Sequence, residues 1–338
     1  SIKEAFTEFT SFISDLGIGY TSPGTVNLQA ITPAGTTKPT LCVPQTMMKG
    51  VKALHDKLPC TIFGFKGLKG FSARQIAANL NATWPDIQSR IITFPDHESG
   101  ELYAEVAARS LEVPGTRARL AEMLKKEAGD AAFIGLPAIL GMHNPDNVLA
   151  DLEKLTGLSI FEIPTMPPSV PGIRLREIIE QTLPARGLNL IPQQKIKNID
   201  FGSESLLLRL SDNFGPIEIT ARTALLATGR FLSGGLEAHF DHIEEPLVGL
   251  PVHQPNSREN WYREQYLDGQ GHDIHLAGIE TDNEYRPLNK NNSIFDNRLF
   301  AAGIVLAHQD WIRQRCGAGV AIATALQAVE AVNRQLHQ

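Results

Sequence analysis

The chain has 338 residues, of which 42% are hydrophobic and 20% charged, with a formal net charge of −6. This composition is typical of a globular protein and excludes the disordered and fibrous classes. Because the basic residues are scattered, no nucleic-acid partner is expected. The cysteines, Cys42, Cys60 and Cys316, are too far apart for a zinc or iron–sulfur motif. Because of this cysteine usage we expect a cytoplasmic protein, and no apolar stretch is long enough to span a bilayer.

The first half of the chain alternates between helical and strand patterns. Ser72 and Gln75 form a capping box at the start of one helix. Residues 20–43 are predicted to form a hairpin or small meander. The other predicted elements are helix 2–16, strand 61–65, helix 72–84, strand 90–94, helices 101–111 and 114–128, strand 131–134, helix 146–156 and strand 159–163.

Residues 165–172 contain Pro167, Pro168 and Pro171 and predict a domain boundary, because prolines interrupt regular elements. Beyond this boundary the pattern predicts helix 173–185 and strands 188–191, 195–201, 206–210, 217–220 and 223–229. Residues 230–297 are rich in glycine, proline and asparagine and carry no clear pattern.

Two apolar segments end in glycine and indicate a cofactor site. Thr223–Gly229 ends in Ala-Thr-Gly, and Asn297–Val305 is followed by a polar loop and by Gly-Ala-Gly at 317–319, which opens a long helix. Free N–H groups at a helix start favour an anionic or electron-rich ring. The predicted cofactor residues are Ala227, Thr228, Gly229, Gly303, Ile304, Cys316, Gly317, Ala318, Gly319 and Val320. The alternative is that these glycines only allow close packing of a helix on a strand.

Residues 164–175, 226–236, 280–287 and 316–320 together resemble the B subunit of anaerobic glycerol-3-phosphate dehydrogenase. The resemblance implies a flavoprotein subunit, with FMN or FAD, of a dehydrogenase that oxidises glycerol 3-phosphate and passes electrons to quinone. It implies two partners, an FAD-containing catalytic subunit and an iron–sulfur membrane-anchor subunit. The expected location is then cytoplasmic and peripheral to the inner membrane.

The predicted fold class is α/β, with a flavoprotein-type, Rossmann-like FAD/NAD(P)-binding domain and an inserted α/β domain for substrate or partner. The flavin-type domain is assigned to residues 1–19, 165–235 and 286–338, the inserted domain to 20–164, and a substrate or cap region to 236–285.

One element of the family is not found in this sequence. The family opens with a strand, a glycine-rich turn and a helix, whereas no Gly-x-Gly-x-x-Gly follows a strand near Ser1. Gly64, Gly67 and Gly70 have the wrong spacing and are interpreted as loop glycines. We therefore expect a domain that is incomplete at its N-terminus, with the phosphate-binding turn either upstream of Ser1 or lacking.

Candidate substrate residues are the arginines Arg174, Arg286, Arg230 and Arg313, because guanidinium groups match phosphate oxygens. The alternative for each is a structural ion pair. His308, in the loop between the last strand and the last helix, is the candidate catalytic base. His272 and His275 lack a third ligand, so no metal site is predicted.

Two other functions remain open. The chain could be a non-catalytic partner subunit with a vestigial flavin fold, which the missing turn favours, or a flavin oxidoreductase of the same fold with an unrelated substrate.

Overall fold

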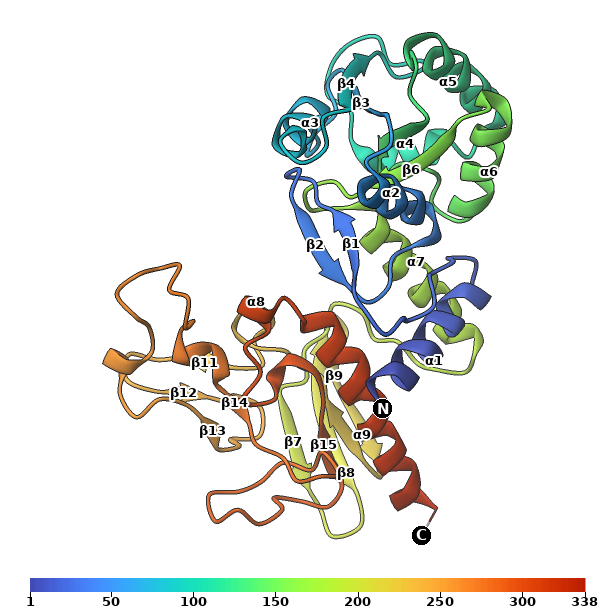
Figure 1. The fold of residues 1–338 in the computed structure, drawn as a ribbon. Coiled ribbons are helices and arrows are strands. Elements are labelled where there is room, and N and C mark those ends of the chain that lie inside the picture. The colour runs from blue at the N-terminus through green and yellow to red at the C-terminus, as the bar shows by residue number, and fades with distance from the viewer. Residues whose placement is uncertain (338) are drawn as a thin grey trace. The chain divides into compact units, whose positions relative to one another are not determined.

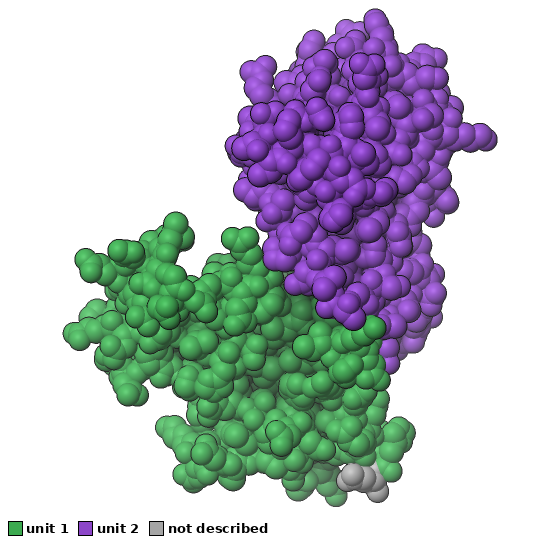
Figure 2. All heavy atoms as spheres, in the orientation of Figure 1, with its two compact units in different colours: residues 1–6, 191–338 green, residues 7–190 purple. Residues whose placement is uncertain are grey.

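A computed structural model describes residues 1–337. The chain folds into two compact units, drawn in different colours in Figure 2: residues 1–6 with 191–338, here called unit 1, and residues 7–190, called unit 2. The division falls inside the first helix, α1 (Ile2–Asp15). None of the helices in residues 1–337 combines the length and the apolar run that crossing a lipid bilayer requires.

Unit 2 is built around a parallel sheet with strand order β4-β3-β5-β6. Its strands are β3 (Cys60–Phe65), β4 (Ile87–Ile92), β5 (Phe133–Pro137) and β6 (Ser159–Ile163). Its further helices are α2 (Gln45–Asp56), α3 (Ala73–Asn81), α4 (Ala104–Ser110), α5 (Pro114–Glu127), α6 (Pro145–Thr156) and α7 (Val170–Ala185). All six residues of β3 are buried, as expected for a central strand covered on both faces.

Helices cover both faces of this sheet (Figure 1). Alternate residues of β3 point to opposite faces, so Ile62 packs with residues of α2 and α3, whereas Phe63 packs with residues of α4, α5 and α6. The expected α/β arrangement of this part of the chain is confirmed. A hairpin of β1 (Leu28–Ile31) and β2 (Thr37–Thr40) precedes it, also as predicted.

Local capping and turn signals were informative in unit 2. The Ser72 side chain accepts a hydrogen bond from the Gln75 N–H, as the capping box predicts. Gly67 has a φ of +77°, and a Cβ there would lie 2.1 Å from the Gly100 carbonyl oxygen. Gly67 and Gly70 therefore serve the turn between β3 and α3, which agrees with their interpretation as loop glycines. Gly64 lies within β3, so its interpretation as a loop glycine was wrong.

One helix was not predicted, one predicted strand is absent, and one predicted helix begins three residues earlier than expected. Helix α2 was not predicted, because Pro44 at its start and Gly50 within it are residues that do not favour helix in a sequence pattern. Residues 188–191 form no strand; Leu188, Leu190 and Ile191 are exposed and pair with no other strand. The proline-rich segment does not exclude helix, since α7 begins within it at Val170 and holds Pro171 in its first turn, where no N–H is needed.

Unit 1 combines short sheets with long connections. Its strands are β7 (Asn198–Phe201), β8 (Leu206–Asp212), β9 (Gly215–Ala221), β10 (Ala224–Leu226), β11 (Glu237–Ala238), β12 (Ile243–Glu244), β13 (Val252–His253), β14 (Gly278–Ile279) and β15 (Leu299–Ala301). Its other elements are α8 (Trp311–Gln314), α9 (Gly317–Leu336) and the 3-10 turns η1 (Phe231–Ser233), η2 (Arg258–Asn260), η3 (Asp273–Leu276) and η4 (Gly303–Val305). Strands β7, β8 and β9 form an antiparallel meander.

The pair β10 and β15 joins two distant segments of unit 1. These strands run parallel, with Ala224 opposite Leu299 and Leu226 opposite Ala301, although they are far apart in the sequence. Leu226, Leu299 and Ala301 lie in one buried cluster with residues of the meander and of η4. Both strands therefore end at the same edge, as the sequence predicts for the cofactor segments.

The predicted division into flavin-type, inserted and cap domains stays a prediction. The compact units separate the chain at other positions, since residues 7–19 and 165–190 belong to unit 2 with the parallel sheet. Residues 191–235 and 236–338 belong together in unit 1.

We expect Gly50→Ala to destabilise unit 2. A Cβ at Gly50 would lie 2.4 Å from the ring of Phe161, which is fully buried on β6. Overpacking of this kind costs about 1–3 kcal/mol, and the better helix propensity of alanine offsets about 1 kcal/mol of it. Urea denaturation, with hydrogen exchange of the β6 amides to localise the effect, measures the loss.

Gly172→Ala in α7 is the matched control. A Cβ there has no heavy atom within 4 Å, so the same substitution should stabilise by up to about 1 kcal/mol. Equal effects of the two substitutions would contradict the packing of α2 on β6.

Candidate functional site

The carboxyl ends of β10 and β15 border a hollow of about 440 Å³, here called the small-residue pocket. This volume lies within the roughly 300–1,000 Å³ of small-molecule sites. The Ala302 N–H donates to the Leu226 carbonyl at 2.9 Å, which fixes the two strand ends side by side. The pocket is lined by Ala227, Gly229, Ala302, Gly303, Ile304, Trp311, Gly317, Ala318, Ala321 and Ala325.

Glycines shape the small-residue pocket. Gly229 and Gly303 have φ values of +69° and +83°, which side-chain-bearing residues rarely adopt. A Cβ at Gly317 would lie 3.3 Å from the Trp311 ring and 3.7 Å from Ile304. Larger residues at these positions would strain the turns or fill the pocket, so the glycines are needed both for the backbone and for the space.

Two kinds of hydrogen-bond donor occur in the segments that line this pocket. Helix α9 begins at Gly317, and its N-cap residue Cys316 makes no side-chain capping bond to the first turn. Trp311 Nε1 is buried and has no hydrogen-bond partner among residues 1–337. A buried donor without a partner is uncommon in a folded protein. The pocket therefore suits a flat, largely apolar ligand that carries hydrogen-bond acceptors, which describes the flavin ring.

Most of the predicted cofactor residues meet at this pocket. Ala227, Gly229, Gly303, Ile304, Gly317 and Ala318 line it, whereas Cys316, Gly319 and Val320 are not among its lining residues. Ala302, Trp311, Ala321 and Ala325 also line it and were not predicted. Ala318, Ala321 and Ala325 are spaced by three and four residues, so this helical period of small residues could have identified the inner face of α9.

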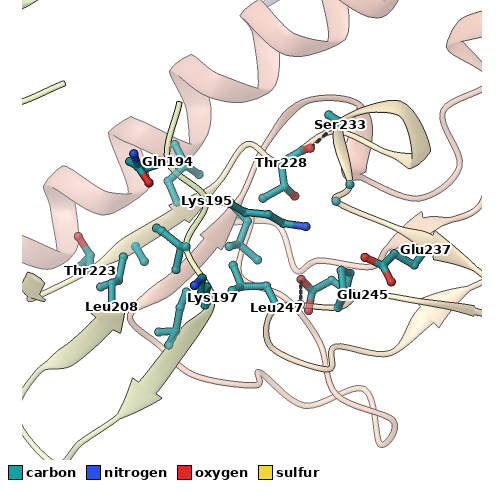
Figure 3. A pocket seen from close by; sticks show the side chains of 18 residues that line it. Gln194, Lys195, Lys197, Leu208, Thr223, Thr228, Ser233, Glu237, Glu245 and Leu247 are labelled. Atoms are coloured by element: carbon teal, nitrogen blue, oxygen red, sulfur yellow. Dashed lines mark hydrogen bonds between the residues drawn. The ribbon is translucent and has the colours of Figure 1, made fainter. Parts of the chain in front are cut away.

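Thr228 lines a second hollow, of about 620 Å³ (Figure 3). Lys195, Glu237 and Glu245 are also among its lining residues. The Thr228 hydroxyl is buried and has no hydrogen-bond partner in the described part of the chain, although its carbonyl accepts a hydrogen bond from Ser233 at 2.7 Å. The Ala-Thr-Gly turn thus separates two hollows, with Ala227 and Gly229 on one and Thr228 on the other.

Buried Glu245 fixes one wall of this second hollow. Its carboxylate accepts hydrogen bonds from the consecutive backbone N–H groups of residues 247–250, at 2.8–3.3 Å. These bonds satisfy a charge that would otherwise be costly to bury. Glu245 is therefore a structural acid rather than a free ligand group.

His308 lies in a polar cleft of about 660 Å³. Its Nε2 is 3.0 Å from Glu280 Oε1, and its backbone has a φ of +63°, an uncommon conformation for a residue with a side chain. His253 lies beside it, with the two ring centroids 4.1 Å apart. Burial, and then the charge of His308, lowers the pKa of His253, while Glu280 opposes this shift.

The cleft adjoins the small-residue pocket. The Gly303 N–H donates to the Thr324 hydroxyl at 2.8 Å; Gly303 lines the pocket and Thr324 lines the cleft. Residues 306–309 continue from η4 along the cleft. The cleft that holds the predicted catalytic histidine and the pocket that holds most predicted cofactor residues are therefore joined by this hydrogen bond between Gly303 and Thr324.

The predicted substrate arginines do not gather there. Arg174 lies in unit 2, where it is 2% exposed and binds Glu162 through both terminal nitrogens at 2.8 Å. Its Nε donates to the Gly141 carbonyl at 2.9 Å. This guanidinium is committed to these partners and forms a structural ion pair, the alternative that the sequence left open.

Arg230 is also fully engaged. It is 4% exposed and donates to the backbone carbonyls of His275, Ile304, Leu306 and Gln309. Burial lowers its pKa to about 10, so it remains charged at neutral pH. Arg230 holds the loop that carries His308 and is a positioning residue.

The other two candidate substrate residues, Arg286 and Arg313, also have partners within the protein. Arg286 pairs with Asp282 at 2.7 Å, and Arg313 donates to the Gly269 carbonyl at 2.5 Å. Asp282 lines the cleft, but neither arginine does. The structure thus brings Arg286 to the rim of the cleft and does not bring the predicted arginines together.

The chain is similar to a known protein family and to several named proteins. The family model described as "FAD binding domain" matches residues 1–320. The B subunit of anaerobic glycerol-3-phosphate dehydrogenase from Vibrio vulnificus strain YJ016 is 32% identical over 71% of this chain and 56% of that protein. The protein of the same name from Vibrio cholerae strain M66-2 is 30% identical over 92% of this chain and 72% of that protein.

The chain spans only part of these relatives. For the corresponding protein of Aliivibrio fischeri strain ES114, 29% identical, the match covers 99% of this chain and 78% of that protein. Among solved structures, an ornithine N-hydroxylase from Kutzneria sp. 744 aligns with 83% of this chain and 55% of its own, with 10% identity and a TM-score of 0.14.

We expect Glu162→Gln to cost about 3–5 kcal/mol of unfolding free energy, because it leaves the Arg174 charge buried without its partner. Glu105→Gln is the control, since Glu105 and Arg109 form an exposed pair whose loss should cost less than about 1 kcal/mol. Urea denaturation of both variants measures the difference.

The ion pair of Glu162 and Arg174 also makes the free energy of unfolding depend on pH. Burial acts to raise the pKa of Glu162, but the Arg174 charge and hydrogen bonds from Arg174, Leu140 and Thr46 hold it below its ordinary value. A lowered folded-state pKa means that this stability is present above the unfolded value of about 4.3 and is lost as the pH falls below it. An acid limb that is identical in wild type and Glu162→Gln would contradict the assignment.

Proposed function

This chain belongs to the FAD-binding domain family and, within it, to the B-subunit family of anaerobic glycerol-3-phosphate dehydrogenase, and we propose that it is a flavin-dependent oxidoreductase subunit that oxidises glycerol 3-phosphate. The observation that carries the flavin part is the small-residue pocket, with its unpartnered Trp311 N–H and uncapped start of α9 among the described residues. The substrate part rests on the names of the relatives.

The residues that would hold the flavin are those of the small-residue pocket. The N–H groups at the start of α9 and Trp311 Nε1 are donors for ring oxygens or nitrogens, and the helix dipole favours negative charge there. A bound flavin supplies the hydride acceptor for the reaction. FAD and FMN share this ring, and mass spectrometry of the cofactor released by heat distinguishes them.

His308 is the proposed base for the substrate hydroxyl. When its Nε2–H is donated to Glu280, Nδ1 carries the lone pair and can accept a proton. Glu280 orients the ring and stabilises the positive charge that the imidazole then gains. Arg230 supports this arrangement, because its guanidinium binds the carbonyls on both sides of the catalytic loop.

We further propose that the protein works in a complex. The relatives are named as B subunits, which supports partners that accept the electrons, an FAD-containing subunit and an iron–sulfur membrane-anchor subunit that passes them to quinone. Without partners, the reduced flavin should accumulate, and this makes the first half-reaction measurable in the isolated protein.

An absorbance spectrum tests the central claim. The purified protein, as isolated or after incubation with FAD or FMN, should show the two visible flavin bands, and anaerobic glycerol 3-phosphate should bleach them while glycerol does not. A protein that stays colourless with both flavins would favour the non-catalytic partner subunit. A flavoprotein that is bleached only by other alcohols would favour an unrelated substrate.

We expect Gly317→Ala to weaken flavin binding by about tenfold, or about 1.4 kcal/mol, because the added methyl meets Trp311 and Ile304 in the small-residue pocket. Gly319→Ala is the matched control two residues along the same helix, where a Cβ would make an ordinary contact of 3.7 Å with Phe6. Titration with flavin, followed by fluorescence quenching, measures both. Equal affinities for the two variants would place the flavin elsewhere.

We expect His308→Asn to slow anaerobic flavin reduction by glycerol 3-phosphate by about 10²–10⁴-fold, the usual contribution of a positioned base, and to leave flavin affinity unchanged. His239→Asn is the control, because His239 contacts Glu244 at 2.9 Å in a similar pair that is remote in sequence from the cleft residues. Stopped-flow absorbance gives the rates. Reduction by His308→Asn at the wild-type rate would remove His308 from the mechanism.

A further inference from the structure

Three potential metal ligands converge at the cleft: His253, Glu280 and His308, here called the His253 cluster. Their ligand atoms all lie within 4.8 Å of one another. Glu280 Oε1 is 3.0 Å from His308 Nε2 and 3.7 Å from His253 Nδ1, so both imidazoles approach the same oxygen. Ligands of a tetrahedral zinc ion at about 2.0–2.2 Å lie only slightly more than 3 Å apart. Small side-chain movements would therefore bring the cluster to zinc geometry.

Hydrogen-bonded backbone holds the three segments together. His253 ends β13 and lies opposite Gly278 of β14, and Glu280 follows β14 directly. The Ala307 N–H donates to the Ile279 carbonyl, and the His308 N–H to the Leu276 carbonyl, each at 2.9 Å. The three ligands therefore come from separate segments that backbone hydrogen bonds hold side by side. Metal binding would need little further ordering of the backbone.

The ligand types suit zinc. Two imidazoles and one carboxylate form a common three-residue zinc set, with a fourth position for water. The two imidazole rings lie with their centroids 4.1 Å apart, so a single ion can reach one nitrogen of each ring. All three side chains are partly exposed, which leaves a path for the ion.

A second group with the same composition provides a comparison. His239, His242 and Glu244 lie in the hairpin of β11 and β12. There the two histidines approach different oxygens of Glu244, at 2.9 and 4.0 Å, and their rings are stacked with an interplanar angle of only 12°. His242 also binds Asp241. In the His253 cluster the rings are tilted by 50°, so their nitrogens can converge on one point.

We propose that His253, Glu280 and His308 form a zinc-binding site, with water completing the coordination. This site goes beyond the oxidation proposed above. Zinc binding is measured without substrate and without flavin reduction, so its test does not depend on that proposed function. Zinc on His308 Nε2 requires hydrogen on Nδ1, the atom proposed as base. Zinc should therefore slow any reaction that uses this imidazole to accept a proton.

Isothermal titration of the chelator-treated full chain with Zn²⁺ tests the site. We expect His253→Ala to weaken the tightest binding event by at least about tenfold, a loss that even an outer-shell partner of a metal can cause. Glu280→Gln should behave alike, and circular dichroism checks that both variants fold. A double variant, His239→Ala with His242→Ala, should keep the wild-type affinity.

Cobalt(II) provides a second readout. The Co²⁺-loaded protein should show visible d–d bands and no thiolate charge-transfer band, because no cysteine belongs to the cluster. Unchanged zinc affinity in His253→Ala would overturn the proposal. Loss of affinity only in the His239 and His242 variant, or a thiolate band, would also overturn it by locating the metal elsewhere.

Discussion

The geometry of unit 1 depends on one buried guanidinium. Arg230 follows the Ala-Thr-Gly turn and binds backbone carbonyls of η3, η4 and the loop beyond it. These segments lie 45–79 residues further along the chain and have little regular structure of their own to hold them. A buried guanidinium is tolerated only when its N–H donors have acceptors. The loop carbonyls therefore hold the arginine in place, and the arginine in turn fixes the positions of the loops. The small-residue pocket and the His308 cleft both lie against the chain that it fixes.

Unit 2 uses the same principle with a different partner. Arg174 is neutralised by Glu162 on β6, and the pair also binds Thr46 and the backbone at Leu140 and Gly141. Its bonds join the start of α7 to the carboxyl ends of the parallel strands. In both units an arginine that resembles a ligand-binding residue in the sequence is part of the structural framework.

The sequence predicted features that depend on neighbouring residues. The cap at Ser72 and the strand ends before Gly229 and Gly303 were recognised, because turns and caps are determined within a few residues. The pairing of distant side chains was not predictable in this way. The acceptors of Arg230 and the grouping of His253 with Glu280 and His308 arise only when segments far apart in the chain become neighbours. Helix α2 was missed for another reason, since its glycine lowers helix propensity but is needed for contact with Phe161.

The walls of the small-residue pocket have an entropic consequence. Alanine and glycine have no side-chain rotamers to lose, so a ligand that enters between β10, β15 and α9 orders almost no side chain except those of Ile304 and Trp311. The usual penalty of about 0.5–1.5 kcal/mol for each immobilised side chain is largely absent. A rigid ring would lose little internal freedom as well. Binding of such a ring would therefore be limited mainly by its lost translation and rotation, and the shape of this pocket would favour stiff ligands over flexible ones of equal apolar area.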